Sequence, residues 1–148
     1  MYRYLLARIY YMWGSLHRNF GNRSSFRREH RAAIKRFTQA YETDPSLREA
    51  RLDRGILLYR EMGLLDEAMA DFDALLSDDP HYGPALLNRA MVAQESGRYP
   101  QALADLETYL ALPSGDDEYR AMAERTTHVL REIVAELPGA TVGNEREA

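Results

Sequence analysis

The amino-acid sequence contains one pattern of small, aromatic and proline residues three times, at intervals of 34 or 35 residues. In each block an alanine is followed four residues later by a large side chain, then by another apolar residue and a proline. The blocks are Ala33, Phe37, Ala40 and Pro45; Ala68, Phe72, Leu75 and Pro80; and Ala102, Leu106, Tyr109 and Pro113, of which Pro113 comes one residue early. Because a unit of this length cannot bury an apolar face alone, the chain is constrained to fold as a stack of similar units.

The spacing within each block is typical of two antiparallel helices. Alanine lets the helices approach closely, the large side chain one turn later fills the space beneath it, and the proline ends the second helix. A small residue precedes each block, and a glycine marks the turn inside two of the units; these residues are Gly21, Gly55 and Ala90, and Gly63 and Gly97. The intervals between them place one extra residue in the second unit, between Gly55 and Gly63.

These motifs resemble the tetratricopeptide repeat family over residues 14–113. The second and third units carry the family's small residue, turn glycine and crossing alanine, whereas the first unit departs from the pattern at His17, Ser24 and Arg28. The resemblance implies an all-α fold, a right-handed α-solenoid of three helix hairpins. The implied repeats are about 14–47, 48–82 and 83–115.

Hydrophobic periodicity predicts seven helices. Their expected ranges are 2–20, 27–43, 47–62, 65–77, 82–96, 99–111 and 116–136. The last helix has apolar residues on one side and charged residues on the other, which is what the end of a repeat stack needs to keep water from its core. We therefore expect a single domain over residues 1–137, closed by a capping helix at 116–137, and a disordered tail at 138–148.

The first predicted helix has a stripe of large apolar side chains at helical spacing. The stripe consists of Leu5, Ile9, Trp13, Leu16 and Phe20. Such stripes usually pack into a core, so we expect this helix to be the extended leading helix of the first unit, docked on the second helix. Two alternatives remain open for residues 1–20: an anchor on a membrane surface, since tyrosines and arginines are mixed along this helix, and a seam between two copies of the chain.

Charge is distributed unevenly along the chain, whose formal net charge is −4. Residues 1–40 contain nine basic residues and one acid, whereas the remainder contains ten arginines and twenty-two acids. This asymmetry can steer a charged partner to one end of the molecule. We expect no binding to nucleic acid, because the acidic remainder would oppose a polyanion.

Residue types that support catalysis or metal binding are sparse. The chain has no cysteine, its four histidines are scattered, and it has no phosphate-binding glycine loop. Asp71 is expected on the solvent side of its helix, beside Phe72. We therefore expect no enzyme activity, no metal and no cofactor, and a cytoplasmic protein without stable membrane insertion, because no apolar run is long enough to span a bilayer.

The resemblance implies that the protein binds a partner. In the family, the leading helices line a concave groove that holds a peptide or helix of another protein. The matching positions of this sequence are Arg18, Asn19, Asn22, Leu52, Asp53, Ile56, Tyr59, Asn88 and Met91. The extra residue after Gly55 leaves two registers open, one that turns Tyr59 and Arg60 into the groove and one that turns in Leu58 or Glu61.

One groove of this family is a clamp for the acidic C-terminal tail of heat-shock chaperones. Arg18 and Asn22 match its first pair, but Asp53 replaces an asparagine, and Pro84 and Asn88 stand where its last two cations should be. Because a carboxylate at Asp53 would repel an acidic tail, the chaperone clamp is rejected. The prediction is a non-catalytic protein-interaction scaffold with apolar side chains in the middle of its groove.

Overall fold

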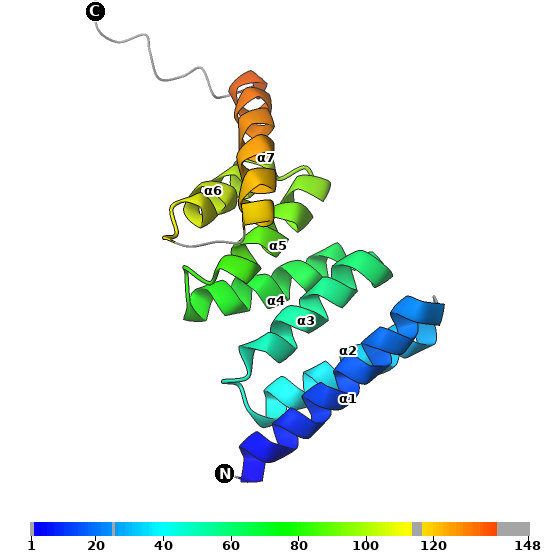
Figure 1. Cartoon of the computed structure of the whole chain (residues 1–148). Coiled ribbons are helices and arrows are strands. Elements are labelled where there is room, and N and C mark those ends of the chain that lie inside the picture. The colour runs from blue at the N-terminus through cyan, green and yellow to red at the C-terminus, as the bar shows by residue number, and fades with distance from the viewer. Residues whose placement is uncertain (1, 25, 114–116, 139–148) are drawn as a thin grey trace, which may run out of the picture. The chain divides into compact units, whose positions relative to one another are not determined.

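The computed structural model describes residues 2–24, 26–113 and 117–138. All regular elements in these ranges are helices, and none is a strand. In chain order they are α1 (Tyr2–Ser24), α2 (Arg27–Thr43), α3 (Arg48–Leu57), the π-helix η1 (Leu58–Met62), α4 (Leu65–Asp78), α5 (Gly83–Glu95), α6 (Tyr99–Leu110) and α7 (Asp117–Glu136) (Figure 1). The predicted all-α fold of helical hairpins is confirmed, since each predicted helix overlaps an observed one.

The chain divides into two compact units, Met1–Pro80 and His81–Ala148. The first contains α1 to α4, and the second contains α5 to α7. The boundary follows the proline that closes the second predicted repeat. The repeat boundaries and the right-handed sense of the stack stay predictions, and the predicted tail lies, apart from Pro138, outside the described residues.

Helix α1 packs on α2 through a line of buried small residues spaced seven apart, Ala7, Gly14 and Gly21. A Cβ atom on Gly14 would lie 2.6 Å from the ring of Phe37, and one on Gly21 would lie 2.3 Å from the ring of His30. Real Cβ atoms do not approach other atoms so closely, so glycine is what lets the two helices come together here.

This contact corrects the alignment of Gly21 with Gly55. In the second hairpin Gly55 faces Phe72, seventeen residues later, whereas in the first hairpin Gly14 faces Phe37, twenty-three residues later. The first hairpin is therefore longer at its closed end, where α1 continues to Ser24 and α2 begins at Arg27. Positions of the first unit that were counted from Gly21 are displaced by two helical turns.

The apolar stripe of α1 is exposed to solvent. Its members Leu5, Ile9, Trp13, Leu16 and Phe20 are between 39% and 60% exposed. The prediction that α1 docks on α2 is confirmed, but the expectation that this stripe packs into the core is wrong. Glycine and alanine let helix axes approach more closely than large side chains do, so the small face of α1 packs inward.

The extra residue of the second unit is accommodated by the π-helical turn η1, which follows α3 directly. A π turn is what one inserted residue produces in an α-helix. Leu58 is buried in it, Tyr59 is half-buried, and Arg60 and Glu61 are exposed. Gly63 then ends the helix in the left-handed region, at a φ of 69°.

Two buried arginine–aspartate pairs repeat along the chain, one in each unit. Arg54 Nε donates to Asp71 Oδ2 at 2.8 Å, and Arg89 Nε donates to Asp105 Oδ2 at 2.8 Å. The guanidinium of Arg54 also lies 4.8 Å from the ring centroid of Tyr41. The expectation that Asp71 faces solvent is wrong, because this residue is only 3% exposed. A buried carboxylate requires a paired cation, and the arginine of the leading helix supplies it.

In the second unit, helix α7 packs against α6. Ala123 and Leu130 are buried, at 0% and 1% exposed. Arg120 Nη2 donates to the carbonyl oxygen of Leu110 at 2.6 Å, and it thereby satisfies a backbone acceptor at the C-terminal end of α6. The apolar side of α7 thus covers α6.

Candidate functional site

Helices α1 and α3 place an ion pair and a tyrosine together in the first unit. Arg18 Nη1 lies 2.8 Å from Asp53 Oδ2, and the hydroxyl of Tyr11 donates to the same oxygen at 2.9 Å. Tyr11 and Arg18 share a face of α1 because they are seven residues, or two turns, apart. We call the surface formed by Tyr11, Arg18, Leu52, Asp53 and Ile56 the α1–α3 face.

The ion pair of this face is partly shielded from water. The side chain of Arg18 is 28% exposed, and that of Asp53 is 14% exposed. The guanidinium of Arg18 also lies 5.8 Å from the ring centroid of Phe37, the buried centre of the first hairpin. The charge of Arg18 is therefore balanced within the protein and held against its core.

Two apolar residues of α3 are close neighbours of Asp53 in the helix. Leu52 and Ile56 are four residues apart, so they lie on the same side of the helix, and both are half-buried. These half-buried aliphatic side chains add apolar surface to the α1–α3 face beside its neutralised ion pair. Such a surface can hold an aliphatic or aromatic anchor of another molecule.

We expect the phenol of Tyr11 to lose its proton at a higher pH than exposed tyrosines do. Burial raises the pKa of Tyr11 above its ordinary value of 10.0, and the charge of Asp53 raises it further. Because the pKa of Tyr11 is higher in the folded state than in the unfolded state, the protonated phenol stabilises the fold. This contribution to the free energy of unfolding is fully present when the pH is below the ordinary tyrosine pKa. It is lost as the pH rises through the folded-state pKa. In a titration of phenolate absorbance, Tyr11→Phe should remove one late-titrating group; an unchanged late phase would contradict the assignment.

The other predicted residues of the first unit lie elsewhere. Asn22 Oδ1 lies 3.0 Å from Nε2 of His30, whose Nδ1 lies 3.7 Å from Glu61, so Asn22 contacts the closed end of the first hairpin. Asn19 is exposed on α1, and Tyr59 is half-buried in η1. The structure therefore brings Arg18 and Asp53 together and places Asn22 in a separate contact, while Leu52 and Ile56 are half-buried neighbours of Asp53 on α3.

The remaining predicted residues belong to helix α5 of the second unit. Asn88 Nδ2 donates to the carbonyl oxygen of Pro84 at 2.8 Å, one turn earlier in the same helix. Met91 is half-buried. Leu87, four residues before Met91, is buried and belongs to the core. Asn88 and Met91 stay predicted contact residues of this unit.

Sequence reasoning missed Tyr11 as a member of the site. The repeats were aligned on Gly21, and Arg18 lies three residues before that glycine. When Gly14 is the reference instead, the residue three positions earlier is Tyr11. The signal that could have found it was the seven-residue spacing of Ala7, Gly14 and Gly21, which marks the packed line of α1.

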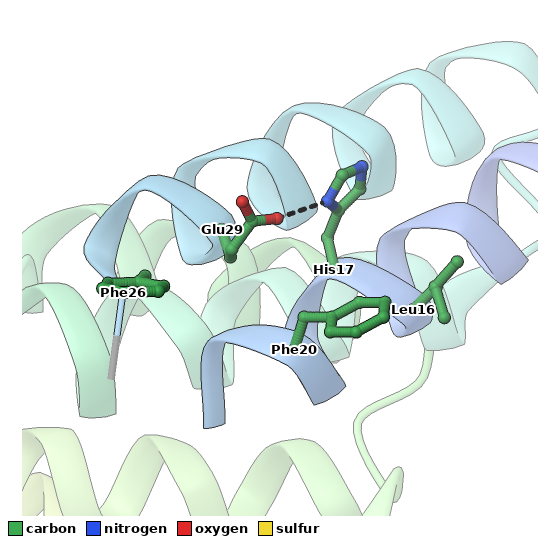
Figure 2. Close-up of a pocket in the computed structure, with 5 residues that line it drawn as sticks. All are labelled: Leu16, His17, Phe20, Phe26 and Glu29. Carbon is green, nitrogen blue, oxygen red and sulfur yellow. Dashed lines mark hydrogen bonds and ion pairs between the residues drawn. The ribbon is translucent and has the colours of Figure 1, made fainter. Parts of the chain in front are cut away.

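A second feature that the sequence did not indicate is a shallow hollow at the closed end of the α1–α2 hairpin. Its volume is about 430 Å³, and it is lined by Leu16, His17, Phe20, Phe26 and Glu29. Figure 2 shows His17 of α1 and Glu29 of α2 joined across it, with His17 Nδ1 2.8 Å from Glu29 Oε2. The hollow is mainly apolar and continues the exposed stripe of α1.

Over residues 2–24, 26–113 and 117–138, no three histidine, aspartate or glutamate side chains are grouped as a metal site would require. No helix within those same ranges combines the length and the apolar character needed to cross a bilayer.

Comparison with known proteins agrees with this architecture. Residues 59–125 match the family model for the tetratricopeptide repeat. The TPR domain of OM64 from Arabidopsis is similar in structure, with 18% identity and a TM-score of 0.71, over 88% of this chain and 98% of that one. The second TPR domain of human RPAP3, solved by NMR with an HSP70 peptide, has 18% identity and a TM-score of 0.66, over 84% of this chain and 98% of that one. The repeated hairpins and these structural likenesses show that the described residues have the fold of tetratricopeptide repeat domains, and residues 59–125 match that family directly.

Proposed function

We propose that this protein is a non-catalytic interaction scaffold that binds a peptide or helical segment of a partner protein through the leading helices of its repeats. The observation that carries the proposal is the α1–α3 face, where the half-buried Leu52 and Ile56 share helix α3 with Asp53, whose charge is balanced by Arg18. Partner binding at such a surface requires apolar anchors and no reactive group.

The charges of this face favour a ligand of a particular kind. RPAP3, a structural neighbour, was solved with an HSP70 peptide of sequence SGPTIEEVD. In this chain the cation of Arg18 is balanced by Asp53, so an acidic peptide would gain little attraction and would approach a carboxylate. We therefore propose a ligand with aliphatic or aromatic anchors rather than an acidic C-terminal tail.

A random peptide library displayed on phage tests this function even though the partner is unidentified. Peptides selected on the full chain should bind Ile56→Asp about tenfold more weakly or worse, because a carboxylate would replace an apolar contact at the centre of the face. Val129→Asp is the matched control, since Val129 is 52% exposed on α7 of the second unit.

Two results would refute the proposed site. The first is that the selected peptides bind Ile56→Asp as tightly as they bind the wild type. The second is that Ile56→Asp and Val129→Asp lose the same amount of affinity for these peptides. Circular dichroism of each variant must first show an unchanged helix content. Arg18→Glu gives an independent second variant, because it replaces the ion pair with two like charges on the same face.

A further inference from the structure

The outward side of α1 is the most extensive exposed apolar surface of the first unit. We call it the outer α1 face; it consists of Tyr2, Leu5, Ile9, Met12, Trp13, Leu16 and Phe20. Each of these side chains is between 39% and 78% exposed. Apart from the adjacent Met12 and Trp13 they recur every three or four residues, so they form one stripe opposite the line of small residues that packs on α2. Exposed apolar patches of this kind mark interaction surfaces.

This stripe runs the length of a long helix and continues around its end. Helix α1 has 23 residues, which corresponds to about 34 Å at the usual rise. At its C-terminal end Leu16 and Phe20 line the hollow that Phe26 completes (Figure 2). Phe26 itself is 64% exposed. The apolar surface therefore extends over the whole of α1 and onto the start of α2.

The charges around the outer α1 face are mainly positive. Residues 2–24 contain four arginines and no aspartate or glutamate. Arg18 is paired with Asp53 on the other side of α1, whereas Arg8 and Arg23 are exposed. Helix α2 adds further cations, and the guanidinium of Arg36 lies 4.9 Å from the ring centroid of Trp13. The single acid of the first forty residues, Glu29, is occupied by His17. An apolar stripe bordered by cations complements a surface that has an apolar interior and an anionic outer layer.

We infer that the outer α1 face lies on an anionic lipid surface, with α1 parallel to the plane of the membrane. Apolar side chains of the stripe enter the boundary between headgroups and acyl chains, tyrosine and tryptophan rings lie at that boundary, and the neighbouring arginines meet lipid phosphates. A second copy of the chain fits less well, because a two-fold seam would place two acid-free, arginine-bearing helices against each other. The surface lies on the opposite side of α1 from the α1–α3 face, so the two proposals are independent.

The chain's single tryptophan gives a direct test. The full chain is mixed with vesicles of phosphatidylcholine alone, or with vesicles that also contain phosphatidylserine. With phosphatidylserine we expect co-sedimentation, a shift of Trp13 emission to shorter wavelength and protection from a water-soluble quencher. Raising the salt concentration should weaken the binding. Equal binding to both vesicle types, or binding that leaves Trp13 emission unchanged, would overturn the inference.

Two double variants distinguish membrane binding by the outer α1 face from its pairing with a second copy of the chain. Ile9→Asp with Leu16→Asp should reduce vesicle binding about tenfold or more, because two carboxylates enter the stripe. Val129→Asp with Tyr119→Asp, at exposed positions of α7, should leave it unchanged. Unaltered circular dichroism establishes that each variant folds. A dimer in sedimentation that dissociates in the first variant, with no vesicle binding by the wild type, would assign the face to a second copy and overturn the membrane inference.

Discussion

Replacing Arg54 by leucine is expected to lower the free energy of unfolding by about 3–5 kcal/mol at neutral pH. The substitution leaves the carboxylate of Asp71 without its cation at a residue that is 3% exposed. In the wild type the guanidinium donates to both oxygens of that carboxylate. Removing one partner of a buried pair is costly because the remaining charge is desolvated and uncompensated. Urea denaturation followed by circular dichroism measures the difference.

An exposed pair in the same unit provides the control for this prediction. Arg48 Nη1 lies 3.0 Å from Asp79 Oδ2, but the two side chains are 49% and 45% exposed. Arg48→Leu should therefore cost less than about 1 kcal/mol. The double variant Arg54→Leu with Asp71→Leu should recover much of the lost stability, since no charge is left buried. If Arg54→Leu and Arg48→Leu lowered the free energy of unfolding equally, burial of Asp71 would not be the reason for the large effect of Arg54→Leu.

The second large effect is expected from Phe37→Ala, which should lower the free energy of unfolding by about 3–5 kcal/mol. Phe37 is 0% exposed. Its ring fills the space opposite Gly14, and its centroid lies 5.6 Å from that of Tyr11. The substitution creates a cavity between α1 and α2 that the surrounding helices can only partly close. Denaturation of the variant, monitored as above, gives the measurement.

A second phenylalanine of the same hairpin serves as the matched control. Phe26 is 64% exposed at the start of α2, so Phe26→Ala should change the free energy of unfolding by less than about 1 kcal/mol. Because Tyr11 and Arg18 both contact Phe37, the variant Phe37→Ala should also weaken ligand binding at the α1–α3 face. Similar destabilisation by both phenylalanine substitutions would contradict the assignment of Phe37 to the centre of the hairpin.

The repeated spacing of the sequence was sufficient to predict the helices and their pairing. Alanine, phenylalanine and proline at fixed intervals specify where helices cross and where they end, because those residue types act through local sterics. The same spacing located the inserted residue between Gly55 and Gly63, and the structure accommodates it as the π turn η1. Helix α7 was predicted as a cap from its one-sided apolar pattern, which depends on periodicity alone.

Part of the candidate site could also be predicted, and part could not. Leu52, Asp53 and Ile56 are placed by the well-matched second repeat, and they do lie on one side of α3. The pairing of Arg18 with Asp53 and the contribution of Tyr11 depend on how far α1 extends beyond the crossing with α2. No local pattern fixes the length of a hairpin whose two helices both continue past their crossing.

By itself, the sequence determined which residues share a face of each helix. Only the tertiary structure decided which face packs inward. Helix α1 has two faces that can pack, one of large apolar residues and one of alanine and glycine, and periodicity cannot choose between them. The close approach of Gly14 to Phe37 and of Gly21 to His30 selects the small face. The large side chains are left exposed, and Asp71 is buried because Arg54 reaches it from another helix, a contact between segments distant in sequence.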